Sequence, residues 1–296
     1  MKVDTEGFMR DGYVILLGVV PPDELDALRV SYETLVNKQR AIWALERQSG
    51  DPPGGLWDTH QQPRLNNVQN QIDISTANAA EVWLKESTMG VSQQLMRAPE
   101  VAVTEMMLMC NPVRNHPGGT GWHRDFHPRG EAPLEGLEMD LAENGPSYVQ
   151  WNIPLYDDSA LWIVPGSHRR RNTEEEELQM RSDPKAPLPG SIPVELKAGD
   201  GVAYTNLIWH SGLDYRAGMR RTIHGGHCSI GGQLFPYVYQ GNWDGDMRFT
   251  EHLSPEAAAT MRDSARLFAE QRDLIEAIFK AVLTMDAGAF HDGLAR

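Results

Sequence analysis

From residue 101 onward the chain consists of short apolar runs separated by turn sequences, and this rhythm limits the fold more than any other feature. The turns are marked by Asn111-Pro112, Pro165-Gly166-Ser167 and Ala198-Gly199-Asp200. The runs predicted to be strands are residues 101–110, 147–155, 161–164, 192–196, 202–204, 222–230 and 234–239. Many short strands at this spacing are typical of a β sandwich or jelly roll.

The segments on either side of this β-rich region are predicted to be mainly helical. Residues 13–20 are predicted to form a short apolar strand. The prolines and acids that follow favour a helix that ends near residue 45. A second helix is predicted over residues 79–97, and helices return after residue 254. Residues 49–67 are rich in Gly, Pro, Gln and Asn, which indicates either a mobile loop or part of a lid over a site.

A chain of 296 residues can fold as a single domain of this kind. We expect one domain over residues 1–296, with helical decoration at about 20–98, a β core at about 101–240 and C-terminal helices at about 254–285. The apolar face of the last helices packs either within the chain or on another subunit. This leaves a monomer and a homodimer both open.

Composition excludes several classes of partner and location. The chain has 41 acidic and 27 basic residues and a formal charge of -14, which opposes binding to nucleic acid or to anionic membranes. Only two cysteines are present, so a disulfide framework is not expected. The N-terminal residues lack the pattern of a secretory signal, and no apolar run is long enough to span a membrane, so we expect a cytoplasmic protein.

A candidate metal site is indicated by the string Gly121-Trp122-His123-Arg124-Asp125. Residues two apart in a strand point to the same face, so His123 and Asp125 are expected to converge. His210, in Ile208-Trp209-His210-Ser211-Gly212, offers a second imidazole. Two histidines and one carboxylate with open positions are the ligands of nonheme iron(II) oxygenases. Taken alone, the His-x-Asp pair is also explained by a hydrogen-bonded surface pair.

Several motifs in order along the chain resemble the phytanoyl-CoA dioxygenase family. The matching segments are Phe8-Met9-Arg10-Asp11-Gly12-Tyr13-Val14, Pro22-Asp23-Glu24-Leu25, Trp122-His123-Arg124-Asp125, Leu161-Trp162-Ile163-Val164-Pro165-Gly166-Ser167-His168, Lys197-Ala198-Gly199-Asp200, Trp209-His210-Ser211-Gly212 and Arg220-Arg221-Thr222-Ile223. The resemblance covers roughly residues 8–230. It implies a mainly β fold with flanking helices, namely a double-stranded β-helix (a jelly roll, cupin-like) with Fe(II) at one mouth and 2-oxoglutarate and O2 as cosubstrates.

The resemblance also implies residues that bind the cosubstrate. An arginine at the start of the strand after the second metal histidine holds the far carboxylate of 2-oxoglutarate, because its planar fork pairs with a carboxylate. Arg220 fits this role best, and Arg221 is the alternative because a shift of one residue reverses the face. Trp151 is assigned to the wall beside the cosubstrate, with Gln150 and Asn152 as the alternative. Ser211 is a candidate donor to the cosubstrate or a plain strand serine.

The remaining histidines near these motifs are expected to have other roles. His127 is interpreted as a pocket or surface residue, and His224 and His227 as mainly structural, with one of them pointing inward. They are not included in the predicted ligand set.

These features together predict an oxygenase that hydroxylates an unactivated C–H bond of a small organic substrate and releases succinate and CO2. Desaturation, epoxidation and ring formation use the same ligands and stay open. Asp125 opposes a halogenase, which replaces the carboxylate ligand with a small residue. A metal-dependent hydrolase with the same ligands, or a noncatalytic jelly-roll binding protein, is the alternative. The substrate does not follow from the sequence.

Overall fold

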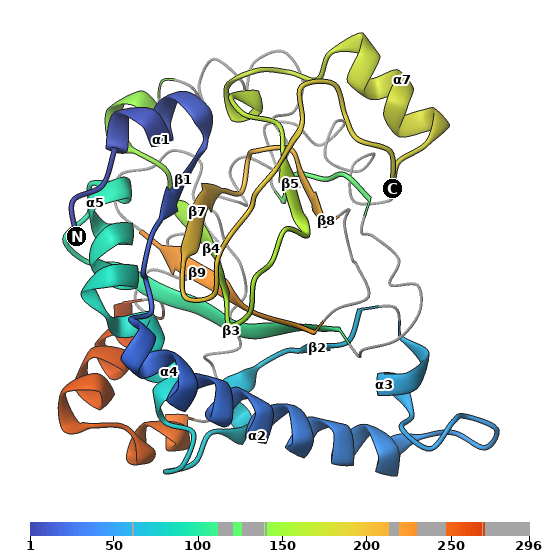
Figure 1. The fold of residues 1–296 in the computed structure, drawn as a ribbon. Helices are drawn as coiled ribbons and strands as arrows, with labels where there is room; N and C mark the ends of the chain where they lie inside the picture. The colour runs from blue at the N-terminus through green and yellow to red at the C-terminus, as the bar shows by residue number, and fades with distance from the viewer. Residues whose placement is uncertain are drawn as a thin grey trace.

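Two antiparallel sheets form the centre of the molecule (Figure 1). The computed structural model describes residues 1–60, 62–111, 121–125, 139, 141–212, 219–229, 247–267 and 269. The larger sheet has the order β1 (Tyr13–Leu16), β7 (Gly201–Thr205), β4 (Tyr148–Pro154), β9 (Arg220–Cys228), β3 (Ala102–Asn111) and β2 (Arg64–Leu65). The smaller sheet has the order β6 (Ile192–Pro193), β5 (Leu161–Ile163) and β8 (His210–Gly212).

The chain passes back and forth between the two sheets. After β4 in the larger sheet it enters β5 and β6, returns to β7, crosses to β8 and returns to β9. All pairings between neighbouring strands are antiparallel. This alternation is the winding of a double-stranded β-helix, and it confirms the predicted fold class.

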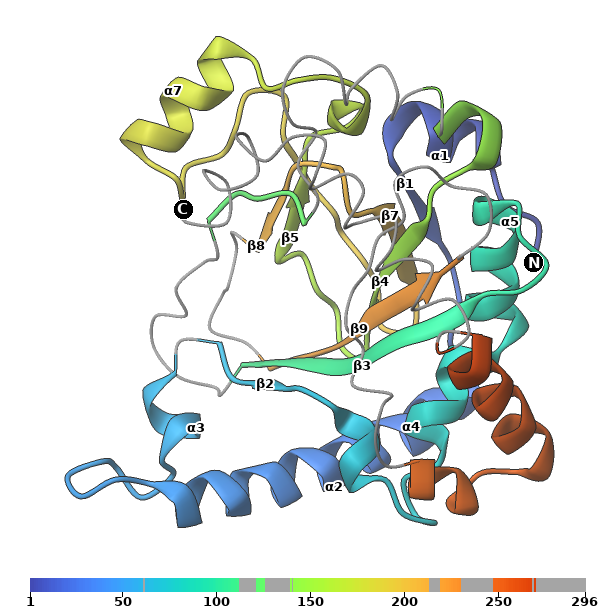
Figure 2. The same cartoon turned by 180° about the vertical axis from the view of Figure 1, so that it is seen from behind.

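Helices cover one face of the larger sheet. Helix α2 (Pro22–Glu46) begins with a proline in its first turn, followed by Asp23 and Glu24, as expected for a helix N-terminus. Its fully buried Leu35 and Val36 belong to the main apolar core. In both views α2 lies below β2, β3 and β9, whereas β5 and β8 lie on the other side of these strands (Figures 1 and 2). The face of the larger sheet that the helices cover is therefore apolar. Its other face, toward the smaller sheet, is available for a functional site.

The central strands show how side chains are divided between these faces. Strand β4 is buried along its whole length, yet its residues alternate in character. Trp151 and Ile153 join the apolar core, whereas Gln150 and Asn152 line a pocket on the other face. Period-two alternation of a strand therefore separates the core from the pocket.

The predicted helix over residues 79–97 is broken into shorter pieces. The structure has α4 (Asn78–Glu81), a 3-10 turn (Val82–Leu84), a π-helical turn (Glu86–Gly90) and α5 (Val91–Met96). Lys85 adopts an extended conformation between the turns, with ψ of 155°, and so interrupts the helix. The Thr88 hydroxyl donates to the Val82 carbonyl at 2.7 Å, which satisfies a carbonyl left unpaired by the break.

Other elements differ from the sequence predictions mainly at their ends. The strand predicted over residues 13–20 stops at Leu16, and Gly18 takes a positive φ of 63° in the turn that follows. The short strands β2 and β8 were not among the predicted strands. The last helix is described over residues 255–267. The predicted strand at 234–239 and the part of the predicted C-terminal helices beyond residue 269 lie outside the described residues. No helix in the described part of the chain is long and apolar enough to cross a membrane.

A buried polar network joins helix α5 to strands β4 and β9. The Ser92 hydroxyl accepts a hydrogen bond from Trp151 Nε1 at 2.9 Å and lies 2.9 Å from His227 Nδ1. His227 Nε2 lies 2.9 Å from the Trp83 carbonyl, which can only accept, so Nε2 carries the proton and Nδ1 accepts from Ser92. Burial lowers the pKa of His227 to about 4. His227 therefore has a structural role in the neutral form.

Acid is expected to destabilise the protein partly through His227. Below pH 6.5 the unfolded chain protonates this imidazole, whereas the folded protein resists protonation until about pH 4. Its contribution is therefore complete above the unfolded pKa and is lost as the pH falls. Urea titrations at about pH 7 and pH 5 measure how much the free energy of unfolding falls between these two values. We expect this fall to be smaller in His227→Gln than in wild type by on the order of 1–2 kcal/mol. An unchanged pH dependence would contradict this role.

Candidate metal centre

The two imidazoles and the carboxylate predicted to bind metal meet at one end of the sheets. One ligand atom from each of His123, Asp125 and His210 lies within 4.8 Å of the other two. The two carboxylate oxygens of Asp125 lie 3.7 Å from His123 Nε2 and 3.7 Å from His210 Nε2, respectively. The imidazole centroids are 4.3 Å apart. Three donors that face one point at these separations can hold a divalent ion.

Backbone pairing brings the two motifs together. The amide of His123 donates to the His210 carbonyl at 3.0 Å, and the amide of His210 donates back to His123 at 3.0 Å. The Asp125 amide also donates to the Asn206 carbonyl at 3.0 Å. The segment 121–125 is thus an extended neighbour of β8, which explains why residues far apart in sequence share one site.

Backbone carbonyls select the histidine nitrogens that face the metal position. His123 Nδ1 lies 2.9 Å from the Gly121 carbonyl, and His210 Nδ1 lies 3.0 Å from the Ile208 carbonyl. A carbonyl only accepts, so each Nδ1 carries the proton and each Nε2 presents a lone pair. Hydrogen bonds of this kind orient metal-bound imidazoles in proteins. The donor set therefore fits Fe(II), with one carboxylate and two neutral imidazoles.

His210 is kept neutral by its surroundings. Burial, and secondly the neighbouring His123, lower the pKa of His210 to about 4. Its ring packs edge-on against Tyr204, with centroids 5.4 Å apart. The His123 side chain is more open, with 43% of its surface exposed compared with 6% for His210. The site is therefore accessible from the side of His123.

Arg124 points away from the metal ligands and fixes the loop that carries them. Its buried guanidinium donates to the carbonyls of Ser167, at 2.7 Å, and Leu207. It also stacks over the Trp209 ring at 4.9 Å. Burial lowers the pKa of Arg124 to about 10. The side chain between the two ligands thus ties their segment to the turn after β5 and to the residues before β8.

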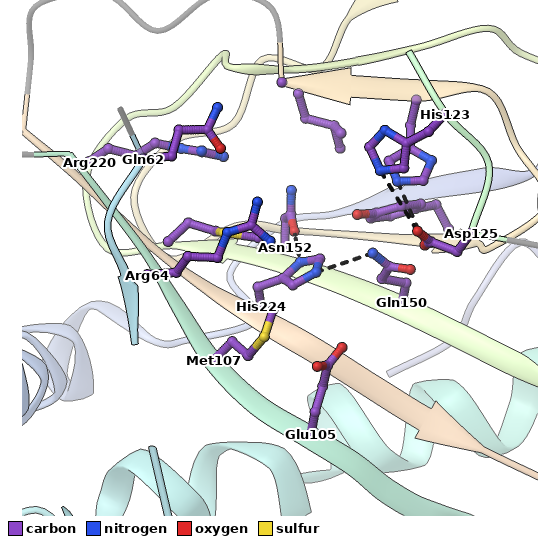
Figure 3. Close-up of a pocket in the computed structure, with 15 residues that line it drawn as sticks. Gln62, Arg64, Glu105, Met107, His123, Asp125, Gln150, Asn152, Arg220 and His224 are labelled. Atoms are coloured by element: carbon purple, nitrogen blue, oxygen red, sulfur yellow. Dashed lines mark hydrogen bonds and ion pairs between the residues drawn. The ribbon is translucent and has the colours of Figure 1, made fainter. Parts of the chain in front are cut away.

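A pocket of about 220 Å³ lies between the sheets beside the triad (Figure 3). Its wall comes from alternate residues of the larger sheet and from the residues that precede and form β2. The lining residues are Gln62, Arg64, Glu105, Met107, Met109, His123, Asp125, Gln150, Asn152, Leu161, Tyr204, His210, Gly212, Arg220 and His224. Gln62 and Arg64 come from the segment interpreted as either a mobile loop or part of a lid, and they place its end on the pocket wall.

Arg220 and Arg221 lie on opposite faces of β9. Arg220 lines the pocket, and its Nε donates to Asp158 Oδ2 at 2.8 Å. Arg221 instead donates from Nε to Glu33 Oε1 of helix α2 at 2.6 Å, and its guanidinium lies 5.7 Å from the centroid of Trp57. Of these two alternatives, Arg220 is therefore the one that faces the metal centre.

Two cosubstrate residues predicted from sequence lie elsewhere. Trp151 is fully buried in the apolar core and bonds to Ser92, so its assignment to the pocket wall is wrong. Ser211 is also fully buried, while its neighbours His210 and Gly212 line the pocket. In both cases the strand alternates, and the predicted residue occupies the opposite face from the pocket.

Gln150 and Asn152, the predicted alternative to Trp151, line the pocket together with His224. His224 Nδ1 lies 2.6 Å from Asn152 Oδ1, and its Nε2 lies 3.2 Å from Gln150 Nε2 (Figure 3). Burial lowers the pKa of His224 to about 3, so the imidazole is neutral. Asp158 was not among the predicted site residues, and it accepts hydrogen bonds from Arg220, Thr222 and the Ala160 amide.

The other histidines divide as follows. His224 is the inward-pointing member of the pair in β9, and His227 is structural. His168 Nε2 lies 3.1 Å from the Met9 carbonyl, and this contact joins the turn after β5 to the N-terminal helix α1 (Thr5–Asp11). His127 lies outside the described residues. The cysteines Cys110 and Cys228 are buried and free, as expected.

A double-stranded β-helix with two histidines and one carboxylate at its mouth defines the class of the protein. The family model for phytanoyl-CoA dioxygenase (PhyH) matches residues 8–223, and the chain belongs to this family. It is accordingly an oxygenase that depends on Fe(II) and 2-oxoglutarate. A search of curated protein sequences gave no match.

Solved structures with the same fold support this assignment of architecture. AviO1 from Streptomyces viridochromogenes Tue57 has a TM-score of 0.53 at 20% identity, covering 77% of this chain and 94% of AviO1. SnoK, a carbocyclase of nogalamycin biosynthesis, has a TM-score of 0.52 at 18% identity, with 78% and 84% covered. EctD from S. alaskensis has a TM-score of 0.51 at 18% identity, with 76% of each chain covered.

Proposed function

We propose that this protein hydroxylates an unactivated C–H bond of a small organic substrate, with His123, Asp125 and His210 as its iron ligands. The reaction consumes one 2-oxoglutarate and one O2 and releases succinate and CO2. One oxygen atom enters the alcohol product and the other enters succinate. The observation that carries the proposal is the convergence of the three ligand atoms within 4.8 Å beside a pocket.

Each group of residues has a role in this proposal. His123, Asp125 and His210 would hold Fe(II) beside the pocket. Bound Fe(II) supplies the site at which the 2-oxo acid and O2 react. Arg220 binds the distal carboxylate of 2-oxoglutarate, because it is the arginine of β9 that faces the pocket. Asp158 positions Arg220 by accepting from its Nε, so that the remaining edge of the guanidinium is held in place.

Two features favour an oxygenase over a hydrolase with the same ligands. The match to the dioxygenase family spans both metal motifs. A guanidinium in the pocket also suits a dicarboxylate cosubstrate, which a hydrolase does not use. Ring formation is a second candidate outcome, since the similar fold of SnoK belongs to a carbocyclase. The products distinguish the two reactions, because hydroxylation adds an oxygen atom and ring closure removes two hydrogen atoms.

Succinate release tests the oxygenase assignment. The protein reconstituted with Fe(II) should convert 2-oxoglutarate to succinate in the presence of O2, slowly without substrate and faster with a matching compound. The control is the same protein with Zn(II) in place of iron, which should form no succinate. Absence of iron-dependent succinate with any compound of a broad screen, together with hydrolysis by the Zn(II) form, would favour a hydrolase. Mass spectrometry of the product then identifies the oxidative outcome.

A further inference from the structure

Strand β2 presents a second arginine to the pocket. Its two residues pair with β3 in the registers Arg64–Met109 and Leu65–Leu108. Leu65 and Leu108 belong to the apolar core, while Arg64 and Met109 line the pocket. The alternation of the two strands therefore fixes the Arg64 side chain on the pocket face. In Figure 3 its guanidinium points into the space between Gln62 and Asn152.

In the part of the chain that the structure describes, Arg64 has no ion-pair partner. Arg220 pairs with Asp158 at 2.8 Å, and Arg221 pairs with Glu33 at 2.6 Å. Among the residues that the structure describes, none places a carboxylate within 4.0 Å of the Arg64 guanidinium. Glu105 lines the same pocket but lies on the other side of His224 from Arg64 (Figure 3). An uncompensated cation in a partly enclosed pocket favours the binding of an anion.

Two guanidinium groups in one pocket imply two anionic groups on the bound molecules. The distal carboxylate of 2-oxoglutarate requires one of them, and its other end binds the metal. Arg220 serves that purpose in the proposed function, which leaves Arg64 for the molecule that is oxidised. We propose that Arg64 binds a carboxylate of the primary substrate, so that the enzyme acts on a small organic acid. This inference rests on the proposed function and names its substrate class.

The acidic groups around the pocket favour a single negative charge over a phosphate dianion. Asp125 and Glu105 line the pocket, and Asp158 lies beside Arg220. Arg220 binds 2-oxoglutarate in the proposed function, so Arg64 supplies the one remaining arginine charge for the substrate. A carboxylate matches this charge and the planar fork of the guanidinium, and the nearby Gln62 offers a side-chain amide.

Binding of matched acids and amides tests the inference. The protein is loaded anaerobically with Fe(II) and 2-oxoglutarate. Formation of the visible charge-transfer band shows that both the metal and the cosubstrate are bound. Hexanoate, phenylacetate and similar small acids are then titrated beside their primary amides, and the change in the band gives each affinity. We expect wild type to prefer the acid of at least one pair by about tenfold to a hundredfold. In Arg64→Gln this preference should disappear.

The variants separate the possible outcomes. Arg64→Gln should keep its affinity for 2-oxoglutarate within about twofold, and Arg40→Gln, which replaces an exposed arginine of α2 outside the pocket, should behave as wild type. A loss of 2-oxoglutarate affinity in Arg64→Gln would assign Arg64 to the cosubstrate and overturn the inference. Absence of any acid preference in wild type, including pairs in which neither compound binds, would also overturn it. If the band itself does not form, the proposed function fails instead.

Discussion

His210→Ala is expected to abolish iron binding and 2-oxoglutarate turnover together. His210 contributes one of three ligand atoms, and its Nδ1 hydrogen bond to Ile208 orients the ring toward the other two. Loss of a residue that only supports a metal ligand costs about 10- to 100-fold in metal affinity or activity, so loss of the ligand itself should exceed about 100-fold. Iron content after gel filtration and succinate release measure the two effects.

His123→Ala distinguishes the loss of a metal ligand from a folding defect. The His210 side chain is 6% exposed and its loss leaves a cavity, whereas the His123 side chain is 43% exposed and its loss should change stability little. Both variants should lose iron to a similar extent, while His252→Ala, remote from the pocket, should retain it. Iron binding near the wild-type level in His123→Ala with an intact fold would remove this residue from the ligand set.

Arg220→Lys is expected to raise the concentration of 2-oxoglutarate needed for half-maximal turnover by about 10- to 100-fold. Lysine keeps a positive charge beside Asp158, so the buried carboxylate is not left without a cation. It lacks the planar fork that pairs with a carboxylate, so the cosubstrate loses affinity while the fold is preserved. Titration of 2-oxoglutarate in the succinate assay measures the effect.

Arg221→Lys is the matched control, because it makes the same change at the next residue of the same strand. Arg221 faces Glu33 on the helix-covered side of the sheet, so this variant should leave the 2-oxoglutarate requirement within about twofold of wild type. If Arg221→Lys raises the requirement and Arg220→Lys does not, the cosubstrate does not bind where the proposal places it.

Local periodicity was sufficient to place His123 and Asp125 on one face, but the pocket wall was not predicted from it. His123 and Asp125 were predicted to share a face because they are separated by two positions in the sequence. In the structure His123 Nε2 lies 3.7 Å from Asp125 Oδ1. The same rule would have placed Trp151 with Val149 and Ile153 in the core, leaving Gln150 and Asn152 for the pocket. Trp151 was assigned from the resemblance instead, and this overrode the alternation of its own strand.

Asp158 and Arg64 show a different limit of sequence reasoning. Asp158 was not among the predicted site residues, yet it is a buried partner of Arg220 from 62 positions away. Arg64 lies in a segment rich in turn-forming residues, and its strand is only two residues long. Neither position has a local signature, because its role arises from contact with a distant strand.

The sequence by itself determined the class of fold, the three side chains that converge as candidate metal ligands, and the family. These depend on residue type, on spacing within one strand and on the order of motifs, which are local properties of the chain. Only the tertiary structure decided which arginine faces the pocket, which polar residues line it and which arginine lacks an ion-pair partner among the described residues. Those properties depend on the face that each strand turns to the core, and packing of the two sheets and the covering helices fixes that face.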